Sequence, residues 1–348
     1  MFFGQPTHRS TKGHLHLGAT LIAGLVLAAC VEREIGASKL TNYVERLGTA
    51  ANSNVQDIER SLRVELPADL DTQLVTPTGS LSLIDFLSLS GCEVQANIAK
   101  RNTSMGRAAS ASQRLILDLE FLRLAPNCIT LMQEKGEITV ADTLRENVDL
   151  RRINLPARVF SAILDGPEWH KFWNQPLMLG PYPQSASGDS AQALWELSER
   201  VQRFIAHNWT VADEDLEPLL AAIRVNSGGQ LLAAAALQSD YLDQANQLLR
   251  DAHSKGIYCK NDTVTEAGTI TRTVVTKYFT GDVQRWSAQV SQRHYEIQSA
   301  LHALETDLLP MLPQPYLTWI AERDALLHRL YAAPREHVSV IKETVNAC

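Results

Sequence analysis

The sequence has no excess of positive charge and, beyond its first thirty residues, no long hydrophobic run. Its 348 residues include 32 Lys and Arg against 39 Asp and Glu, which gives a net charge of −7. This acidic balance argues against a general nucleic-acid binder. Outside the N-terminal segment, no apolar run approaches the roughly eighteen residues of a transmembrane helix. The remaining composition, 45% hydrophobic and 20% charged, is ordinary for a folded chain of one or two domains.

The motifs of common enzyme and metal-binding classes are also missing. The chain contains no Gly-x-Ser-x-Gly elbow, His-Glu-x-x-His pair, P-loop or Gly-x-Gly-x-x-Gly fingerprint. The stretch 339–342 fits Ser-x-x-Lys, but the companion motifs of that chemistry are absent. No Cys-x-x-Cys occurs and no two histidines are spaced four apart, so we expect no metal and no cofactor. The sequence therefore favours a non-catalytic protein.

The N-terminal segment is typical of a secretory signal. Arg9 and Lys12 supply a basic start, and no acidic residue precedes Glu32. The apolar run over 15–29 is short and rich in Gly and Ala, which makes it a poor membrane span. An ordinary cleaved signal peptide and an uncleaved anchor helix are the alternatives to a lipoprotein signal.

The end of this apolar run favours the lipoprotein signal. Residues 27–30 read Leu-Ala-Ala-Cys and match the bacterial lipobox, in which small residues admit the peptidase and the cysteine thiol takes a diacylglycerol. We predict a signal peptide over 1–29, membrane attachment through acylated Cys30, and a short tether over 30–38. Val31 stands where an Asp would mark inner-membrane retention. By resemblance to bacterial lipoproteins, this predicts an outer-membrane anchor with the body facing the periplasm.

Once Cys30 is acylated, an even number of cysteines remains in an oxidising compartment, which predicts two disulfides. These cysteines are Cys92, Cys128, Cys259 and Cys348. We favour the pairs closest in sequence, Cys92–Cys128 and Cys259–Cys348. A helical hairpin of 81–101 and 111–125 would place Cys92 opposite roughly residue 119, so the first pair requires the chain to turn back after Pro126.

Apolar residues recur at helical spacing along most of the body, as at Leu40, Tyr43, Val44 and Leu47. We expect a mostly α, irregular multi-helix body, possibly divided into an N-terminal lobe over 39–180 and a C-terminal lobe over 190–348. Prolines and a Ser/Gly cluster mark the boundary between them. The stretch 262–279 alternates Thr, Val and Ile and is the one place where we expect a short β-hairpin.

An aromatic, proline-rich stretch is the strongest candidate for a binding site. It contains Trp169, Phe172, Trp173 and Tyr182. Aromatic side chains on a proline-stiffened loop suit a glycan or an extended peptide. The alternative is that Trp169 and Trp173, four residues apart, cap the core at the end of a helix.

A group of arginines is the second candidate, as a patch that faces phosphate. Its members are Arg145, Arg151, Arg152 and Arg158. Because Glu146 and Asp149 lie among them, a neutralised surface is the favoured interpretation.

Short motifs carry a resemblance to a known family. They are Leu83-Ile84-Asp85-Phe86-Leu87 leading to Cys92, Ala99-Lys100-Arg101-Asn102 with Ser104 and Gly106, and Ser112-Gln113-Arg114-Leu115 followed by Cys128. With the lipobox, the chain resembles a family of proteobacterial lipoproteins known only as a domain of unknown function. The resemblance implies a cell-envelope lipoprotein and no reaction. We expect the segment 101–106 to connect two helices, with Gly106 free to take a positive φ.

These observations lead to three functional hypotheses. The first is a non-catalytic interaction or accessory protein that binds another envelope protein. The second is a cell-envelope hydrolase or glycan-processing enzyme, and the third is a carrier of lipid or another hydrophobic ligand. Their discriminating features are a flat apolar patch, a cleft with convergent catalytic groups, and a dry apolar cavity, respectively.

Overall fold

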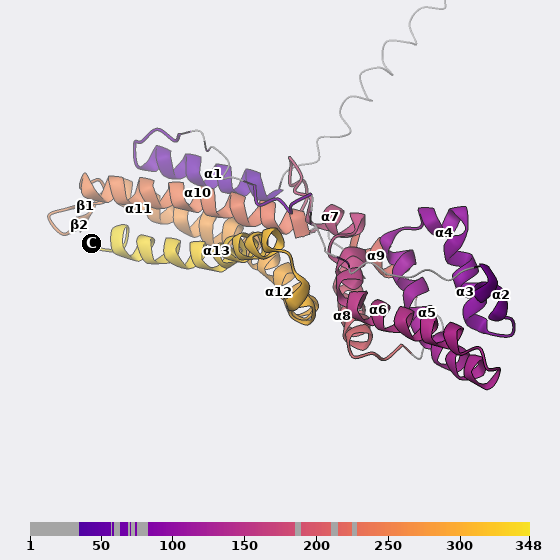
Figure 1. Cartoon of the computed structure of the whole chain (residues 1–348). Helices are drawn as coiled ribbons and strands as arrows, with labels where there is room; N and C mark the ends of the chain where they lie inside the picture. Colours follow the sequence, from indigo (N-terminus) through magenta and orange to yellow (C-terminus); the bar gives the residue numbers. More distant parts are fainter. Residues whose placement is uncertain are drawn as a thin grey trace, which may run out of the picture.

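The protein is built almost entirely of α-helices. The computed structural model describes residues 35–56, 58, 63–68, 70, 74, 83–184, 189–209, 215–224 and 228–348. Within them, the secondary structure besides helices is one two-stranded antiparallel sheet, which confirms the expected fold class. Figure 1 shows an elongated body with a group of helices at each end. The expected signal peptide, the lipobox and Cys30 lie outside the described residues.

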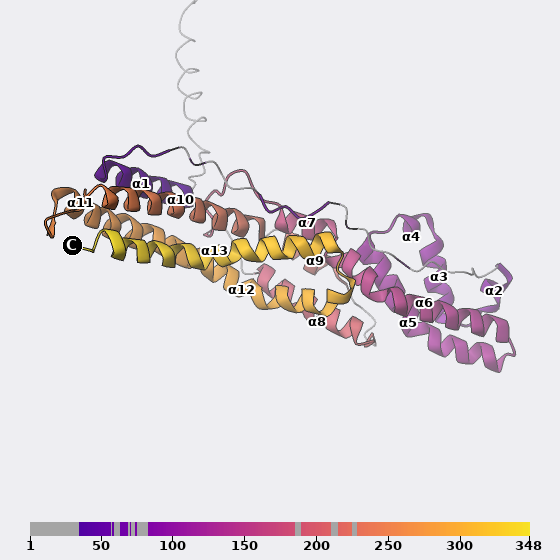
Figure 2. The ribbon, with the colours of Figure 1, turned by 60° about the vertical axis from the view of Figure 1, so that its left-hand side comes forward.

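One group of helices is centred on a long antiparallel hairpin of α5 and α6, visible in Figure 2. Ser110 caps α5 in a reciprocal arrangement with Gln113, and Gly136, with φ +79°, turns the chain between α5 and α6. The elements of this group are α2 (Leu83–Ser88), α3 (Glu93–Asn102), α4 (Ser104–Ala108), α5 (Ala111–Glu134) and α6 (Ile138–Ile163).

The second group is a bundle in which α10 packs along α13. Its elements are α1 (Ile35–Ala50), α10 (Gly228–Ser254), α11 (Glu266–Val274), a π-helix (Val275–Val283), α12 (Gln284–Leu308), a 3₁₀ turn (Leu309–Met311) and α13 (Gln314–Thr344). Between the two groups lie α7 (Pro167–Trp173), α8 (Asp189–Ile205) and α9 (Glu217–Arg224). Helix α8 contacts both α6 and α12, so it links the groups directly.

The first helix does not belong to the lobe in which the sequence placed it. Although α1 falls within the expected N-terminal lobe of 39–180, it packs against α10, α11 and the π-helix. The reason is its apolar stripe, Leu40, Tyr43, Val44 and Leu47, which is buried in that bundle. The helix also begins at Ile35, so any tether that follows Cys30 is shorter than the expected 30–38.

A short β-hairpin is present, but it spans 259–264 and overlaps only the start of the stretch 262–279 in which it was expected. Its strands are β1 (Cys259–Lys260) and β2 (Thr263–Val264), with Cys259 opposite Val264. The rest of 262–279 is helical because Thr265 caps α11, accepting a hydrogen bond from the Gly268 amide at 3.0 Å. Thr271 and Val274 lie three residues apart on α11 and are both buried. These β-branched residues therefore form the buried face of a helix rather than part of a strand.

Both expected disulfides are present. Cys92 and Cys128 join the start of α3 to α5 with their Cα atoms 5.4 Å apart, and Cys259 and Cys348 join β1 to the C-terminus at 5.8 Å. The chain does not turn back after Pro126. Instead α5 continues through that proline, which carries Cys128 to a position opposite Cys92.

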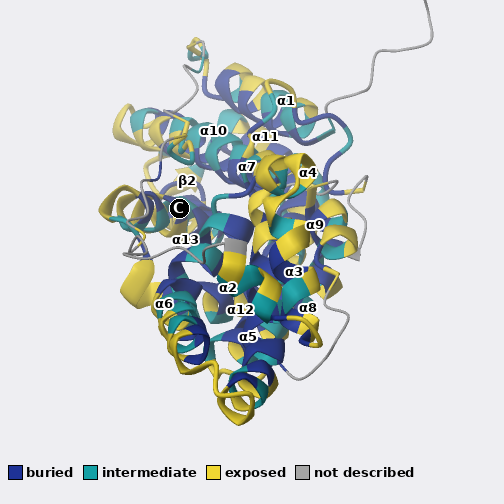
Figure 3. Cartoon of the chain, turned by 45° about the vertical axis from the view of Figure 1, so that its right-hand side comes forward, coloured by how far each residue is buried: buried dark blue, intermediate teal, exposed yellow. Residues whose placement is uncertain are grey.

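The core runs through both groups. Figure 3 shows buried residues on the inner faces of the helices and exposed residues on the outer faces. Among the described residues, the segment Glu217–Ser254 is long and apolar enough to be a candidate membrane span, although it also crosses positions outside the described ones. Leu231, Leu232 and Leu242 are buried in the bundle, which accounts for its apolar composition as that of a core helix.

Candidate binding cleft

An open cleft of about 700 Å³ lies where α3, α4 and α5 meet the segment that leads into α9. Leu119 and Leu216 are buried at its floor, Ile116 is half-buried, and Met105 on α4 is 83% exposed at its edge. Charged residues of both signs complete the lining: Lys100, Arg123, Glu120, Asp215 and Glu217. The volume falls within the range of about 300–1,000 Å³ typical of small-ligand sites.

A tight connection between α3 and α4 shapes one wall of the cleft. Thr103 lies between the helices, and its hydroxyl accepts a hydrogen bond from the Gly106 amide at 3.0 Å. A Cβ atom on Gly106 would overlap the carbonyl of Lys100. The connection expected over 101–106 is reduced to Thr103, because residues 101–102 end α3 and residues 104–106 begin α4, and the reason for glycine also differs. Gly106 has no positive φ and is required instead by close backbone approach.

The three carboxylates of the cleft are all held by structural donors. Asn97 Nδ2 donates to Glu120 Oε2 at 2.8 Å, and Ser112 Oγ donates to Glu217 Oε1 at 2.6 Å. Asp215 Oδ1 accepts from the Glu217 amide at 3.0 Å, beside the start of α9. These carboxylates are therefore used to position helices, and the described residues that line the cleft include no histidine, serine or cysteine for them to activate.

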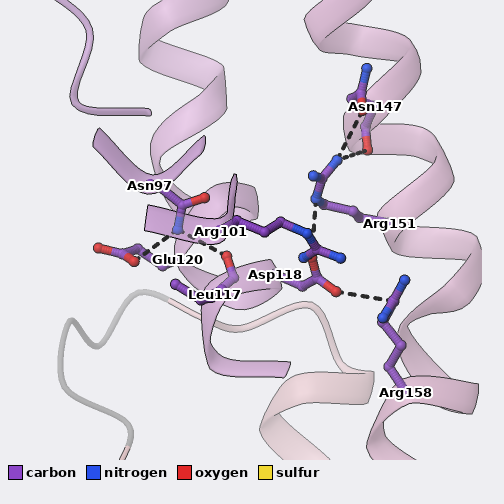
Figure 4. A network of polar contacts seen from close by, with 8 residues as sticks. All are labelled: Asn97, Arg101, Leu117, Asp118, Glu120, Asn147, Arg151 and Arg158. Carbon is purple, nitrogen blue, oxygen red and sulfur yellow. Dashed lines mark hydrogen bonds and ion pairs between the residues drawn. The ribbon is translucent and has the colours of Figure 1, made fainter. Parts of the chain in front are cut away.

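A buried ionic network lies between α3, α5 and α6, and Figure 4 shows its side chains. Asp118 on α5 is at its centre, with a side chain only 2% exposed. Arg101 from α3 pairs with Oδ1, Arg151 Nε lies 3.2 Å from the same atom, and Arg158 Nε lies 3.0 Å from Oδ2. Asn97 lies beside this network, where its Nδ2 donates to the Leu117 carbonyl at 3.0 Å as well as to Glu120.

The network has more positive than negative charge. One carboxylate faces three guanidinium groups, and Arg151 is further held by the Asn147 side chain at 3.1 Å. Burial lowers the pKa of Arg151 to about 10, with Arg101 and Arg158 adding to the effect and Asp118 opposing it. The ring of Phe121 lies 3.8 Å below the Arg151 guanidinium and offsets part of this cost.

The candidate arginine patch divides into two pairs. Arg145 and Arg152 lie on the surface and pair with Asp142 and Asp149, one turn earlier in α6. This part agrees with the neutralised surface favoured from the sequence. The other pair, Arg151 and Arg158, turns inward to Asp118.

The aromatic candidate site is part of the core. Trp169, Phe172, Trp173 and Tyr182 are all buried, with none more than 2% exposed. Trp173 meets Trp319 of α13 edge to face, with ring centroids 5.2 Å apart. No ring face is left for a glycan or a peptide, so the structure contradicts a surface site here. The aromatic side chains of α7 instead pack in the core where the two groups of helices meet.

A buried ion pair completes this junction. Arg323 of α13 donates to both carboxylate oxygens of Glu305 on α12, with Nη2 at 2.9 Å from Oε2. Its guanidinium also lies 4.9 Å from the ring centroid of Trp319 and 5.2 Å from that of Trp173. The aromatic rings and the carboxylate together compensate a cation that water does not reach.

A second buried polar group fixes α1 in the bundle. His337 Nδ1 donates to Asn246 Oδ1 at 2.6 Å, so Nε2 accepts from the Tyr43 hydroxyl at 2.6 Å. All three side chains are buried, and burial lowers the pKa of His337 to about 3. These residue types also occur in catalytic relays, but here all three side chains are buried away from solvent. The hydrogen bonds therefore hold α1 against α10 and α13.

Sequence reasoning missed the centre of the network and the cleft. Asp118 was detectable in principle, because it is the only charged residue in the run Leu115-Ile116-Leu117-Asp118-Leu119. The cleft was not detectable, because its walls come from segments about a hundred residues apart. Among the described residues, no group of three or more His, Cys, Asp or Glu side chains is placed to hold a metal ion.

Fold and cleft together describe a mostly α, disulfide-bonded protein with an open cleft lined by apolar and charged side chains. The chain belongs to DUF3080, a family of proteins of unknown function, whose model matches residues 40–348. This confirms the family of unknown function to which the sequence motifs pointed. No curated protein and no solved structure matches the chain.

Proposed function

We propose that the protein is a lipid-anchored accessory protein of the outer membrane that uses the cleft to bind an apolar segment of an envelope partner in the periplasm. The observation that supports this proposal is the cleft itself, with an apolar floor at Leu119 and Leu216 and a rim of mixed charge. Its carboxylates are occupied in positioning helices, which favours binding over catalysis. Membrane attachment rests on the lipobox at Cys30.

Site-specific photo-crosslinking in cells tests the cleft. A photo-reactive amino acid at position 105 should give a discrete protein adduct on irradiation, because Met105 is exposed at the edge of the cleft. The control is position 153, since Ile153 is also exposed but lies on α6 outside the cleft. Adding Ile116→Asp to the position-105 chain should reduce the adduct, because a carboxylate would enter the apolar wall. Equal adducts at 105 and 153 would contradict the proposal.

Metabolic labelling with a fatty acid tests the anchor. The wild-type chain should incorporate the label, and Cys30→Ser should abolish incorporation and release the protein from the membrane fraction. Labelling that persists in Cys30→Ser would refute attachment at this residue.

The volume of the cleft favours one second function, a carrier of a small hydrophobic ligand. A site of about 700 Å³ is large enough for such a molecule, and its buried floor is apolar. Native mass spectrometry of the purified protein distinguishes the two functions. A co-purifying lipid that is lost in Ile116→Asp would favour the carrier over the accessory protein.

A further inference from the structure

Two adjacent apolar side chains project from the segment between α7 and α8. Leu177 is 76% exposed and Met178 is 63% exposed, whereas the next residue, Leu179, is buried. Burying a large apolar side chain is favourable by about 1.5–3 kcal/mol, so two neighbouring exposed apolar side chains form a candidate contact surface.

The segment that carries this pair is held in place on both sides. Before it, Gln175 Nε2 donates to the Val64 carbonyl at 2.7 Å, and Arg63 Nη2 donates to the Pro176 carbonyl at 2.9 Å. After it, the Gly180 carbonyl accepts a hydrogen bond from the Ile35 amide at 3.3 Å. The backbone that carries Leu177 and Met178 is therefore hydrogen-bonded to the body on both sides of the pair.

The segment that carries Leu177 and Met178 lies next to the start of α1. Ile35 is the first residue of α1, and only four residues lie between it and Cys30. Even fully extended, that length of chain spans only about 17 Å. Ala37 on α1 and Leu177 line the same small pocket, which confirms that the start of α1 and the exposed pair are neighbours.

We propose that Leu177 and Met178 enter the membrane surface beside the lipid anchor and fix the orientation of the body. This inference rests on the proposed acylation of Cys30. A bilayer is the occupant that the short connection places within reach, and it accepts apolar side chains at its interface. Arg63 is exposed beside the pair, where its guanidinium can meet lipid phosphate.

Depth-dependent quenching tests this contact in the full acylated chain. A Met178→Cys variant is labelled with an environment-sensitive fluorophore and reconstituted in vesicles of phosphatidylethanolamine and phosphatidylglycerol that contain nitroxide-labelled lipid. The matched control is Ile138→Cys, because Ile138 is exposed at the start of α6, in the group of helices at the other end of the body from α1 (Figure 1). Quenching at 178 should exceed quenching at 138 at least threefold, and Leu177→Asp should remove most of the difference.

The outcomes separate the inference from its premise. An acylated chain that floats with the vesicles but shows equal quenching at both positions overturns the membrane contact and leaves the anchor intact. A chain recovered with a free Cys30 thiol overturns both. Quenching at 178 that is unchanged by Leu177→Asp would show that proximity to the anchor, rather than insertion of the apolar pair, causes the signal.

Discussion

Asp118 is a buried anion that faces three partly exposed arginines, so its charge matters more than that of any surface acid in the same helices. Arg101, Arg151 and Arg158 approach it from α3 and α6. A buried ion pair contributes little net stability when complete, but the loss of one partner leaves uncompensated charge. The network therefore specifies how these helices meet.

The first prediction concerns the loss of this carboxylate. Asp118→Asn should lower the free energy of unfolding by about 3–5 kcal/mol, because three guanidinium groups would then face a neutral amide. The control, Asp149→Asn, should change it by less than about 0.5 kcal/mol, since that acid is exposed and lies 3.8 Å from Arg152. Urea denaturation measures both, and equal effects would contradict the central position of Asp118.

The second prediction concerns pH and His337. Its pKa is about 3 in the folded protein and 6.5 for an unperturbed imidazole, so below pH 6.5 the unfolded chain binds a proton that the folded protein does not. The free energy of unfolding should therefore fall as the pH is lowered, by about 1.4 kcal/mol per pH unit from this group.

Comparison with a variant isolates that contribution. His337→Gln lowers stability near neutral pH, but the gap to the wild type should shrink by about 2 kcal/mol between about pH 6.5 and about pH 5. Exposed His302→Gln serves as the control and should leave the slope unchanged. Parallel curves for the wild type and His337→Gln would show that the imidazole is not held neutral.

At the scale of elements, one glycine sets how closely two helices approach. A Cβ atom on Gly229 would overlap the carbonyl of Asn174, just after α7. We predict that Gly229→Ala lowers the free energy of unfolding by about 1–3 kcal/mol by forcing α10 away from α7. Gly281→Ala is the control, because the nearest atom to its Cβ would be the Thr276 carbonyl oxygen at 3.8 Å. Urea denaturation of the two variants compares them, and a loss as large in Gly281→Ala would show that the close approach is not the cause.

Most helices were predictable because each buries an apolar residue every third or fourth position. Two features misled the interpretation of elements. Pro126 was expected to end a helix, yet α5 continues through it, and the β-branched stretch after Val264 forms α11. In both cases tertiary burial outweighs the local preference of the residue.

At the scale of the whole molecule, the two groups of helices meet at the aromatic core around α7. Trp173 contacts Trp319 of α13 and lies beside the buried Arg323, so it joins elements that are far apart in sequence. We predict that Trp173→Ala lowers the free energy of unfolding by about 3–5 kcal/mol. Trp195→Ala is the matched control, because that side chain is 45% exposed, and it should cost less than about 1 kcal/mol. Chemical denaturation followed by circular dichroism measures the free energy of unfolding of both variants. Similar decreases in the two variants would show that the aromatic core around α7 contributes no more than an exposed tryptophan.

What the sequence could not show was the joining of distant segments. The cysteine pairs were predictable from spacing and parity. Three features depend on which helix faces meet: the cleft, the inward turn of Arg151 and Arg158, and the placement of α1. The apolar stripe of a helix shows that one face is buried, but it does not show which other helix covers that face. For the same reason, aromatic residues that looked suited to a ligand were indistinguishable from core residues until their neighbours were known.

The position of α1 has a consequence for the order in which the chain folds. Tyr43 and His337 are bonded across 294 residues, whereas α5 and α6 are neighbours in sequence. As the chain emerges from its N-terminal end into the compartment where it folds, the helical hairpin can form early, but the apolar stripe of α1 has no partner until α10, α11 and the π-helix have followed. Helix α1 is thus made before its partners, and its apolar stripe stays exposed until they are in place.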